Sequence, residues 1–97
     1  MTAHTDMVHE VDVIVGKIVE ALEKRELIEK TLIVVTSDNG GIPADRALGH
    51  DAVGGLRGSK SFIWEGGHRV PLVVQWKGRV PAGKVTSQLV GTHDVVP

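Results

Sequence analysis

Cysteine is absent from the 97-residue sequence, and the aromatic residues are limited to Phe62, Trp64 and Trp76. Without cysteine, the chain has no disulfide framework, no thiolate nucleophile and no cysteine-ligated zinc site. An excess of either charge is also missing, because 11 lysines and arginines balance 12 aspartates and glutamates to a net charge of −1. The composition therefore gives no reason to expect a nucleic-acid partner or electrostatic attachment to a membrane surface.

Long apolar runs are missing as well. No stretch approaches the ~18 apolar residues of a membrane-spanning helix, and the first ten residues have neither the basic region nor the apolar core of a signal peptide. We therefore expect no membrane partner, and the sequence leaves the localisation unknown. Hydrophobic residues make up 41% of the chain and charged residues 24%, a balance typical of globular proteins rather than disordered chains.

Apolar residues recur with helical spacing between residues 5 and 27. The periodic positions are Met7, Val11, Ile14, Ile18 and Leu22. This pattern predicts an amphipathic helix, with Thr5 or Asp6 as its amino-terminal cap. Glu20 and Lys24 are spaced to form an ion pair along the helix surface.

Gly16 lies inside the predicted helix, where glycine costs about 1 kcal/mol relative to alanine. We therefore expect Gly16 to pack closely against another element. The apolar surface of this helix also extends slightly beyond one face, which predicts more neighbours than the rest of the chain obviously supplies.

Two runs of mainly β-branched and apolar residues predict strands. Residues 31–36 read TLIVVT, and residues 70–76 read VPLVVQW, with Pro71 near the edge of a sheet. The first run predicts a buried strand of a parallel or mixed sheet, and residues 87–90 predict one more short strand. Helix, strand, excursion and strand together indicate an α/β protein.

Residues 37–69 connect the two strand runs and contain eight of the twelve glycines, without a sustained helical or strand period. A connection this long is usually functional or disordered in a compact domain. Because the composition argues against disorder, we interpret the segment as the wall of an active site.

The tetrapeptide SDNG follows the first strand directly. Asp38 and Asn39 offer hard oxygen ligands suited to Ca²⁺ or Mg²⁺, at the strand end where α/β sheets place ligands. The alternative is a tight hairpin turn, for which Asn-Gly is the commonest signal. Taken alone, this motif favours the turn.

The segment GGLRGSK, residues 54–60, could hold an oxyanion with the point charge of Lys60 and with backbone N–H groups. It does not match the P-loop pattern, and a solvated glycine-rich loop explains it equally well. The following segment EGGHRVP favours a structural role, in which Glu65 or Arg69 orients the neighbouring loop through an ion pair. His68 could contact a ligand or could be a surface histidine.

Other catalytic patterns are missing. The remaining histidines form no local zinc-binding pair, and no G-x-S-x-G serine-nucleophile motif occurs.

The chain resembles the sulfatase family, within the alkaline-phosphatase superfamily, in an ordered series of motifs. These are TLIVVTSDNG, GGLRGSKSFIWEGGHRVPLVVQW and PAGKVTSQLVGTHDVVP, preceded by the helix segment VDVIVGKIVEALEKREL. The resemblance covers essentially the whole chain and is to the carboxy-terminal part of the catalytic domain. It implies that residues 1–97 are a partial sulfatase catalytic domain, truncated at both ends. The implied fold is a fragment of an alkaline-phosphatase-like α/β sandwich: helix, strand, long glycine-rich active-site loop, strand and short terminal strand.

The resemblance also implies roles for individual residues. Asp38 and Asn39 match family ligands of a divalent cation, usually Ca²⁺ with Mg²⁺ as the alternative, and Lys60 matches a lysine that contacts the sulfate group. Glu65 and Arg69 are carried over as structural supports. His68 is a candidate substrate-side residue.

Departures from the family pattern limit what the chain can do alone. The family forms its formylglycine nucleophile from a cysteine or serine in a C/S-x-P-x-R segment, which this chain lacks. The acidic residues that complete the metal site and the upstream basic residues around the sulfate are also missing. We therefore expect a fragment whose longer parent hydrolyses sulfate esters, with the isolated chain inactive.

Two alternatives remain at this stage. One is a phosphoesterase or phosphonate hydrolase of the same superfamily, and the other is a non-catalytic interaction module. A fragment of a larger sandwich leaves a sheet edge and apolar faces exposed, so we also expect a homo-oligomer.

Overall fold

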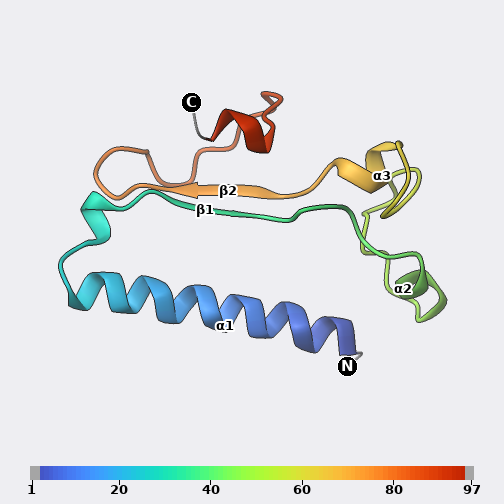
Figure 1. Cartoon of the computed structure of the whole chain (residues 1–97), viewed down its shortest axis with the longest axis horizontal. Coiled ribbons are helices and arrows are strands. Elements are labelled where there is room, and N and C mark those ends of the chain that lie inside the picture. Colours follow the sequence, from blue (N-terminus) through green and yellow to red (C-terminus); the bar gives the residue numbers. More distant parts are fainter. Residues whose placement is uncertain (1–2, 96–97) are drawn as a thin grey trace.

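The computed structural model describes residues 3–95, without the side chains of residues 3, 4 and 45. The chain termini on which the expected truncation depends, Met1 and Pro97, lie outside the described residues. Figure 1 shows the order and arrangement of the elements. They are α1 (Ala3–Lys24), η1 (Ile28–Lys30), β1 (Ile33–Thr36), α2 (Ala44–Ala47), α3 (Glu65–His68), β2 (Leu72–Gln75) and η2 (Thr92–Asp94).

The predicted amphipathic helix is confirmed as α1, with 22 residues. Its predicted cap is wrong, because α1 includes Ala3, so Thr5 and Asp6 lie inside the helix instead of before it. The predicted ion pair is present, since the Lys24 Nζ atom donates to the Glu20 carboxylate at 2.6 Å. Both side chains are exposed, so this pair contributes little to stability.

The close packing expected at Gly16 is absent. A Cβ atom built on Gly16 meets no other group within 4 Å. The apolar stripe of α1 is exposed in the described structure, including Met7, Val11, Ile14 and Ile18. The helix therefore forms from its own periodicity, while its apolar face remains uncovered.

The two predicted strand runs pair with each other in a purely antiparallel sheet, instead of the parallel or mixed sheet that the first run predicted. β1 and β2 form an antiparallel two-stranded sheet, in which Val34 lies opposite Val74 and Val35 opposite Val73. A parallel pair needs a crossover, usually a long helix on one face of the sheet. The connection between the strands contains only the single-turn helices α2 and α3, so the chain turns back and enters β2 antiparallel to β1 (Figure 1).

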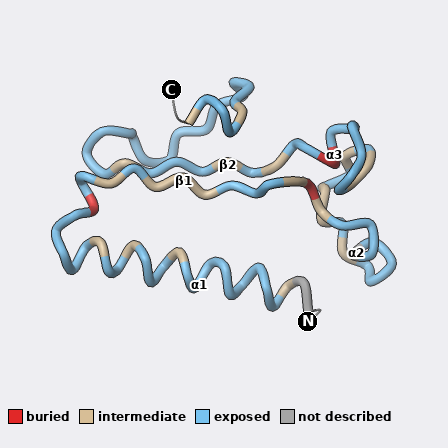
Figure 2. The backbone as a smooth tube through the Cα atoms, in the orientation of Figure 1, coloured by how far each residue is buried: buried red, intermediate tan, exposed pale blue. Residues whose placement is uncertain are grey.

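Burial is confined to few positions. Ile28, 5% exposed, is the buried hydrophobic residue among those described, and the other buried positions are glycines (Figure 2). The expected buried strand is therefore half-buried in β1, and β2 is mostly exposed. The Trp76 Nε1–H donates to the Glu29 carbonyl at 3.0 Å and ties the end of β2 to η1.

The predicted strand over residues 87–90 is wrong. This segment has no strand assignment in the structure, and Leu89 is 96% exposed. Extended backbone becomes a strand only when a neighbour pairs with it, and the described residues place none beside this segment. The turn η2 follows, with the Gly91 N–H donating to the Asp94 carboxylate at 2.7 Å.

The surface is large for the size of the chain. The whole chain exposes 8024 Å², whereas a compact monomer of 10.4 kDa exposes roughly 5,400 Å². About 2,600 Å² more surface thus remains in solvent than a compact fold of this mass leaves.

Within residues 3–95, no helix is both long enough and apolar enough to cross a bilayer.

Candidate functional site

The three motifs singled out in the sequence meet at one end of the molecule, beyond β1 and before β2 (Figure 1). Backbone hydrogen bonds join them in pairs. The Gly40 N–H donates to the Gly67 carbonyl at 2.9 Å, the Lys60 N–H to Gly41 at 2.9 Å, and the Gly66 N–H to Arg57 at 2.7 Å. We refer to Gly40, Gly41, Gly58, Gly66 and Gly67 as the glycine junction.

The junction requires glycine because its backbones approach too closely for side chains. A Cβ on Gly40 would overlap the Gly66 carbonyl, and a Cβ on Gly67 would overlap the Phe62 carbonyl. Gly58 has φ of +82°, and a Cβ there would lie 2.8 Å from the Trp64 Cβ. The sequence indicates a glycine-rich wall, but it does not indicate which glycines touch.

Asp38 and Asn39 lie at the carboxyl end of β1, as predicted. Asp38 is exposed and Asn39 is half-buried, with the Asn39 Nδ2 donating to the Gly40 carbonyl at 2.9 Å. The Ser37 hydroxyl donates to the Asn39 carbonyl at 2.9 Å and stabilises this bend. The hairpin-turn alternative is wrong, because Gly40 bonds to Gly67 and the next strand begins only at Leu72.

The metal expectation fits the structure only in part. Asp38 and Asn39 have oxygen donors of the type that Ca²⁺ and Mg²⁺ prefer. Within the part of the chain that the structure describes, however, no group of three His, Cys, Asp or Glu side chains could hold a metal ion. Ca²⁺ takes about 6–8 oxygen ligands, so these residues alone do not form a complete cation site.

Backbone hydrogen bonds fix the position of Lys60. Its N–H bonds to Gly41, and the preceding Ser59 carbonyl accepts the Phe62 N–H at 3.0 Å. The Lys60 side chain is exposed. The loop that carries the predicted oxyanion-binding lysine is therefore attached to the backbone that follows Asp38 and Asn39.

Glu65 and Arg69 form the ion pair that the sequence suggested, but with each other. The Arg69 Nη1 lies 2.7 Å from the Glu65 carboxylate, and the Arg69 N–H donates to the Glu65 carbonyl at 2.8 Å. Both bonds close the single turn α3 and do not reach the neighbouring loop. The His68 Nε2 lies 3.1 Å from the Ile63 carbonyl, so this ring bonds to the preceding turn.

One contact of the site has no sequence signal. The Arg57 guanidinium carbon lies 3.6 Å from the centre of the Trp64 ring, a cation–π stack between the GGLRGSK loop and the turn before α3. No periodicity or motif pairs these two residues. The stack depends on how the junction folds the two segments together.

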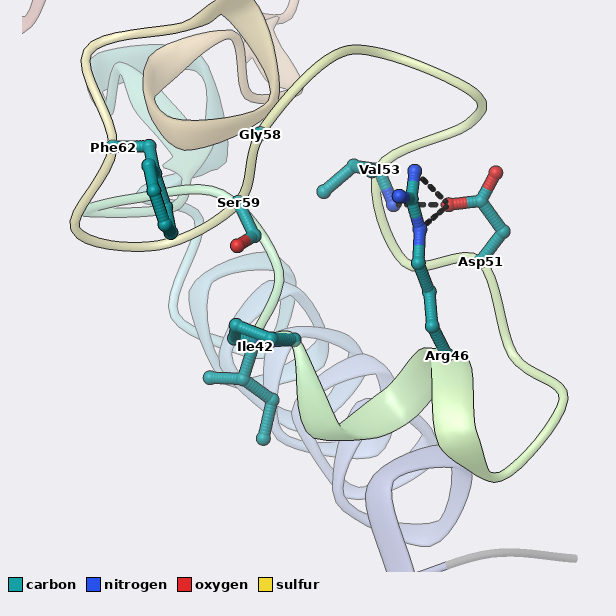
Figure 3. Close-up of a pocket in the computed structure, with 8 residues that line it drawn as sticks. Ile42, Arg46, Asp51, Val53, Gly58, Ser59 and Phe62 are labelled. Carbon is teal, nitrogen blue, oxygen red and sulfur yellow. Dashed lines mark hydrogen bonds and ion pairs between the residues drawn. The ribbon is translucent and has the colours of Figure 1, made fainter.

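A pocket of about 220 Å³ lies beside the junction (Figure 3). Its lining is Ile42, Pro43, Arg46, Asp51, Val53, Gly58, Ser59 and Phe62. Figure 3 shows the Arg46 side chain rising from α2 between Val53 and Asp51. The sequence did not indicate this pocket, because its walls come from three separate parts of the long connection.

Asp51 holds one wall of the pocket in place. Its carboxylate accepts the Gly55 N–H at 2.6 Å and the Val53 N–H at 3.4 Å, and it pairs with Arg46 at 3.4 Å. The hydrogen bond from Gly55 is the main cause that lowers the pKa of Asp51 below its ordinary value. Desolvation is the next largest influence and opposes it, while Val53 and Arg46 lower the pKa further. The ionised carboxylate is therefore the form that orders this loop.

Comparison with known protein families shows to which family the chain belongs. A family model described as Sulfatase matches residues 1–97. The chain belongs to the sulfatase family. Its motif series, including Asp38, Asn39 and Lys60, thus lies in a sulfatase sequence. The similar proteins described next are sulfatases, which are sulfuric ester hydrolases.

Individual sulfatases are similar over nearly all of the chain. Arylsulfatase H of Homo sapiens is 40% identical over 96 residues, which cover 95% of this chain and 17% of that protein. Steryl-sulfatase of Mus musculus is 35% identical, over 98% of this chain and 16% of that protein. N-acetylgalactosamine-6-sulfatase of Canis lupus familiaris is 37% identical, over 93% of this chain and 17% of that protein.

The chain therefore spans about a sixth of the length of the curated relatives that it matches. No solved structure matches it significantly.

Proposed function

We propose that the chain is part of a sulfatase catalytic domain, residues 1–97, and that the longer protein hydrolyses sulfate esters. The observation that carries this proposal is the glycine junction, which joins the Asp38–Asn39 bend to the Lys60 loop through the Gly41–Lys60 hydrogen bond of 2.9 Å. Membership of the sulfatase family supports sulfate over phosphate or phosphonate as the group that is transferred.

In this proposal, Lys60 contacts the sulfate group. Hydrolysis of a sulfate ester builds negative charge on the non-bridging and leaving-group oxygens, and a fixed ammonium group stabilises that charge. Because the Lys60 side chain is exposed here, it is free to approach a substrate that binds over the junction.

Asp38 and Asn39 would supply two oxygen ligands to a divalent cation, Ca²⁺ or Mg²⁺. When bound, this cation would add positive charge beside the sulfate oxygens. The other ligands would come from elsewhere in the longer protein, because the described residues of this chain do not complete the site. Glu65 and Arg69 support α3, and His68 is the candidate residue on the substrate side.

The isolated chain is expected to be inactive. It contains no cysteine and no S-x-P-x-R segment from which a formylglycine nucleophile could form. Clear turnover of an aryl sulfate by the purified 97-residue chain with added Ca²⁺ would contradict this expectation.

Sulfate binding tests the proposal directly. In an NMR titration with sodium sulfate, matched in ionic strength by sodium chloride, we expect shifts centred on the Lys60 and Gly41 amides. Lys60→Ala should abolish these shifts, whereas Lys84→Ala removes one exposed lysine outside the junction and should preserve them. Equal loss of the shifts in both variants would indicate nonspecific ion binding and would contradict the proposed role of Lys60.

The interaction-module alternative has one observation in its favour, which is the surplus of exposed surface. The same surface also fits part of a larger domain, so we propose self-association of the isolated chain as its consequence rather than as a separate function.

A further inference from the structure

The Arg57–Trp64 stack joins the loop that carries Lys60 to the turn before α3, beside the backbone hydrogen bond from Gly66 to the Arg57 carbonyl. The guanidinium carbon of Arg57 lies 3.6 Å from the ring centre, at the short end of cation–π geometry. Arg57 belongs to the loop that carries Lys60, and Trp64 directly precedes α3. The stack therefore holds the lysine loop against the α3 turn.

Backbone contacts at the same point act in the same direction. The Gly66 N–H donates to the Arg57 carbonyl at 2.7 Å and joins the two segments, while the Gly67 N–H donates to the Trp64 carbonyl at 2.7 Å and closes the α3 turn itself. A Cβ on Gly58 would lie 2.8 Å from the Trp64 Cβ. The absence of a side chain at Gly58 is thus what lets the Trp64 ring lie under Arg57.

The lysine loop needs such a restraint because of its backbone. Gly54, Gly55 and Gly58 have φ values of +60°, +79° and +82°. Glycine loses more conformational freedom on ordering than any other residue, so a loop with three such positions opens readily. The Arg57–Trp64 stack then adds a side-chain restraint to the backbone hydrogen bonds that hold the loop closed.

We propose that Arg57 and Trp64 are positioning residues, whose stack fixes the loop in which Lys60 bonds to Gly41. Arg57 suits this role because its planar guanidinium stacks on an aromatic face. The inference rests on the proposed function to the extent that Lys60 binds sulfate. The ordering of the loop by the stack does not depend on that function.

The first arm of the test measures loop order in the 97-residue chain by NMR. The protons of the Arg57 side chain should show upfield ring-current shifts from Trp64. In Arg57→Gln, we expect the Lys60 and Gly66 amides to exchange about two- to fivefold faster, the factor that an exposed cation–π contact provides. The Leu27 amide, which bonds to the Leu22 carbonyl far from the loop, should keep its rate.

The second arm separates the stack from the charge of Arg57. Trp64→Leu keeps that charge and removes the aromatic face, so it should also speed exchange at Lys60 and weaken sulfate binding about two- to fivefold. Trp64→Phe keeps an aromatic face and should restore most of both properties. Arg79→Gln removes the same charge from a second, looser stack, 4.9 Å from the Trp76 ring, and should change neither.

Each outcome decides one claim. If Arg57→Gln and Trp64→Leu leave exchange at Lys60 and Gly66 unchanged, the positioning role is wrong. If Arg79→Gln has the same effect as Arg57→Gln, the effect is general electrostatics and the inference is overturned. If the wild-type chain binds no sulfate while the exchange pattern holds, the proposed contact of Lys60 fails and the loop restraint stands. If sulfate binds at Lys60 equally well in Trp64→Leu, the contact of Lys60 with sulfate stands and the positioning role of the stack for that contact is wrong.

Discussion

Gly40 lies where two segments of the junction are in backbone contact. A Cβ at this position would overlap the Gly66 carbonyl, which belongs to backbone and cannot rotate away. At the scale of single residues, the junction thus depends on positions that cannot carry a side chain. Glycine is not required by packing at Gly16, where a Cβ meets nothing within 4 Å.

Two alanine substitutions test this difference. Gly40→Ala should destabilise the chain by about 1–3 kcal/mol, because the added methyl group forces the junction apart. Gly16→Ala should stabilise it by about 1 kcal/mol, because alanine favours the helix and has free space there. Urea unfolding followed by circular dichroism measures both. Equal effects of the two substitutions would show that the junction is not tightly packed.

Asp51 gives its loop a pH dependence. Its folded-state pKa is lowered, chiefly by the hydrogen bond from Gly55, so the ionised form contributes loop order. That order is fully present above the ordinary pKa of 3.8 and is lost as the pH falls through the lowered folded value. We expect the Gly55 amide to titrate with a midpoint below 3.8 in NMR spectra. Asp51→Asn should remove the titration, and a midpoint above that value would contradict the hydrogen-bonded arrangement.

At the scale of elements, helix formation and burial are separate in this chain. α1 has a regular apolar stripe, yet Ile14 and Ile18 on it are exposed, while Ile28 in the short turn η1 is 5% exposed. Stability should therefore depend more on the turn between α1 and β1 than on the long helix itself.

Truncation of single isoleucines measures this contrast. Ile28→Ala should cost about 2 kcal/mol or more, because it removes buried methyl groups and leaves a cavity. Ile14→Ala should change the free energy of unfolding by less than about 0.5 kcal/mol, as at other exposed sites. The comparison requires urea unfolding at a protein concentration low enough to keep the chain monomeric. A larger cost at Ile14 would mean that the helix face is covered in solution.

At the scale of the whole molecule, the main feature is surface that the fold does not bury. The surplus of about 2,600 Å² exceeds the roughly 800 Å² that each partner contributes to a standard protein interface. Part of that surplus is the apolar face of α1, and part is the sheet, whose two strands leave both outer edges without a third strand among the described residues.

We therefore expect the isolated chain to self-associate. Light scattering coupled to size-exclusion chromatography should give a mass above 10.4 kDa that rises with concentration. Ile14→Glu places a charge on the apolar stripe of α1 and should shift the chain toward monomer. Val13→Glu, a matched change beside the stripe, should have a smaller effect. A monomer at high concentration in the unsubstituted chain would contradict this prediction.

Local sequence patterns predicted much of the element list, because helix periodicity and β-branched runs act through neighbours in the chain. They failed where the outcome depended on distant residues. Among the described residues, the segment 87–90 has the composition of a strand but no partner, and the first strand is half-buried because one other strand joins it. The cap at Thr5 or Asp6 was wrong because more than one residue could begin the same helix.

The sequence by itself determined the family, the α/β pattern, the ion pair between Glu20 and Lys24, and the position of Asp38 and Asn39 at the end of a strand. Only the tertiary structure decided that the strands are antiparallel, which glycines form the junction, and that Arg57 stacks on Trp64. The reason is physical. The absence of cysteine and of the C/S-x-P-x-R segment can be read directly from the order of residues in the chain. Contacts between residues of the 37–71 connection depend instead on how the backbone folds back from β1 to β2.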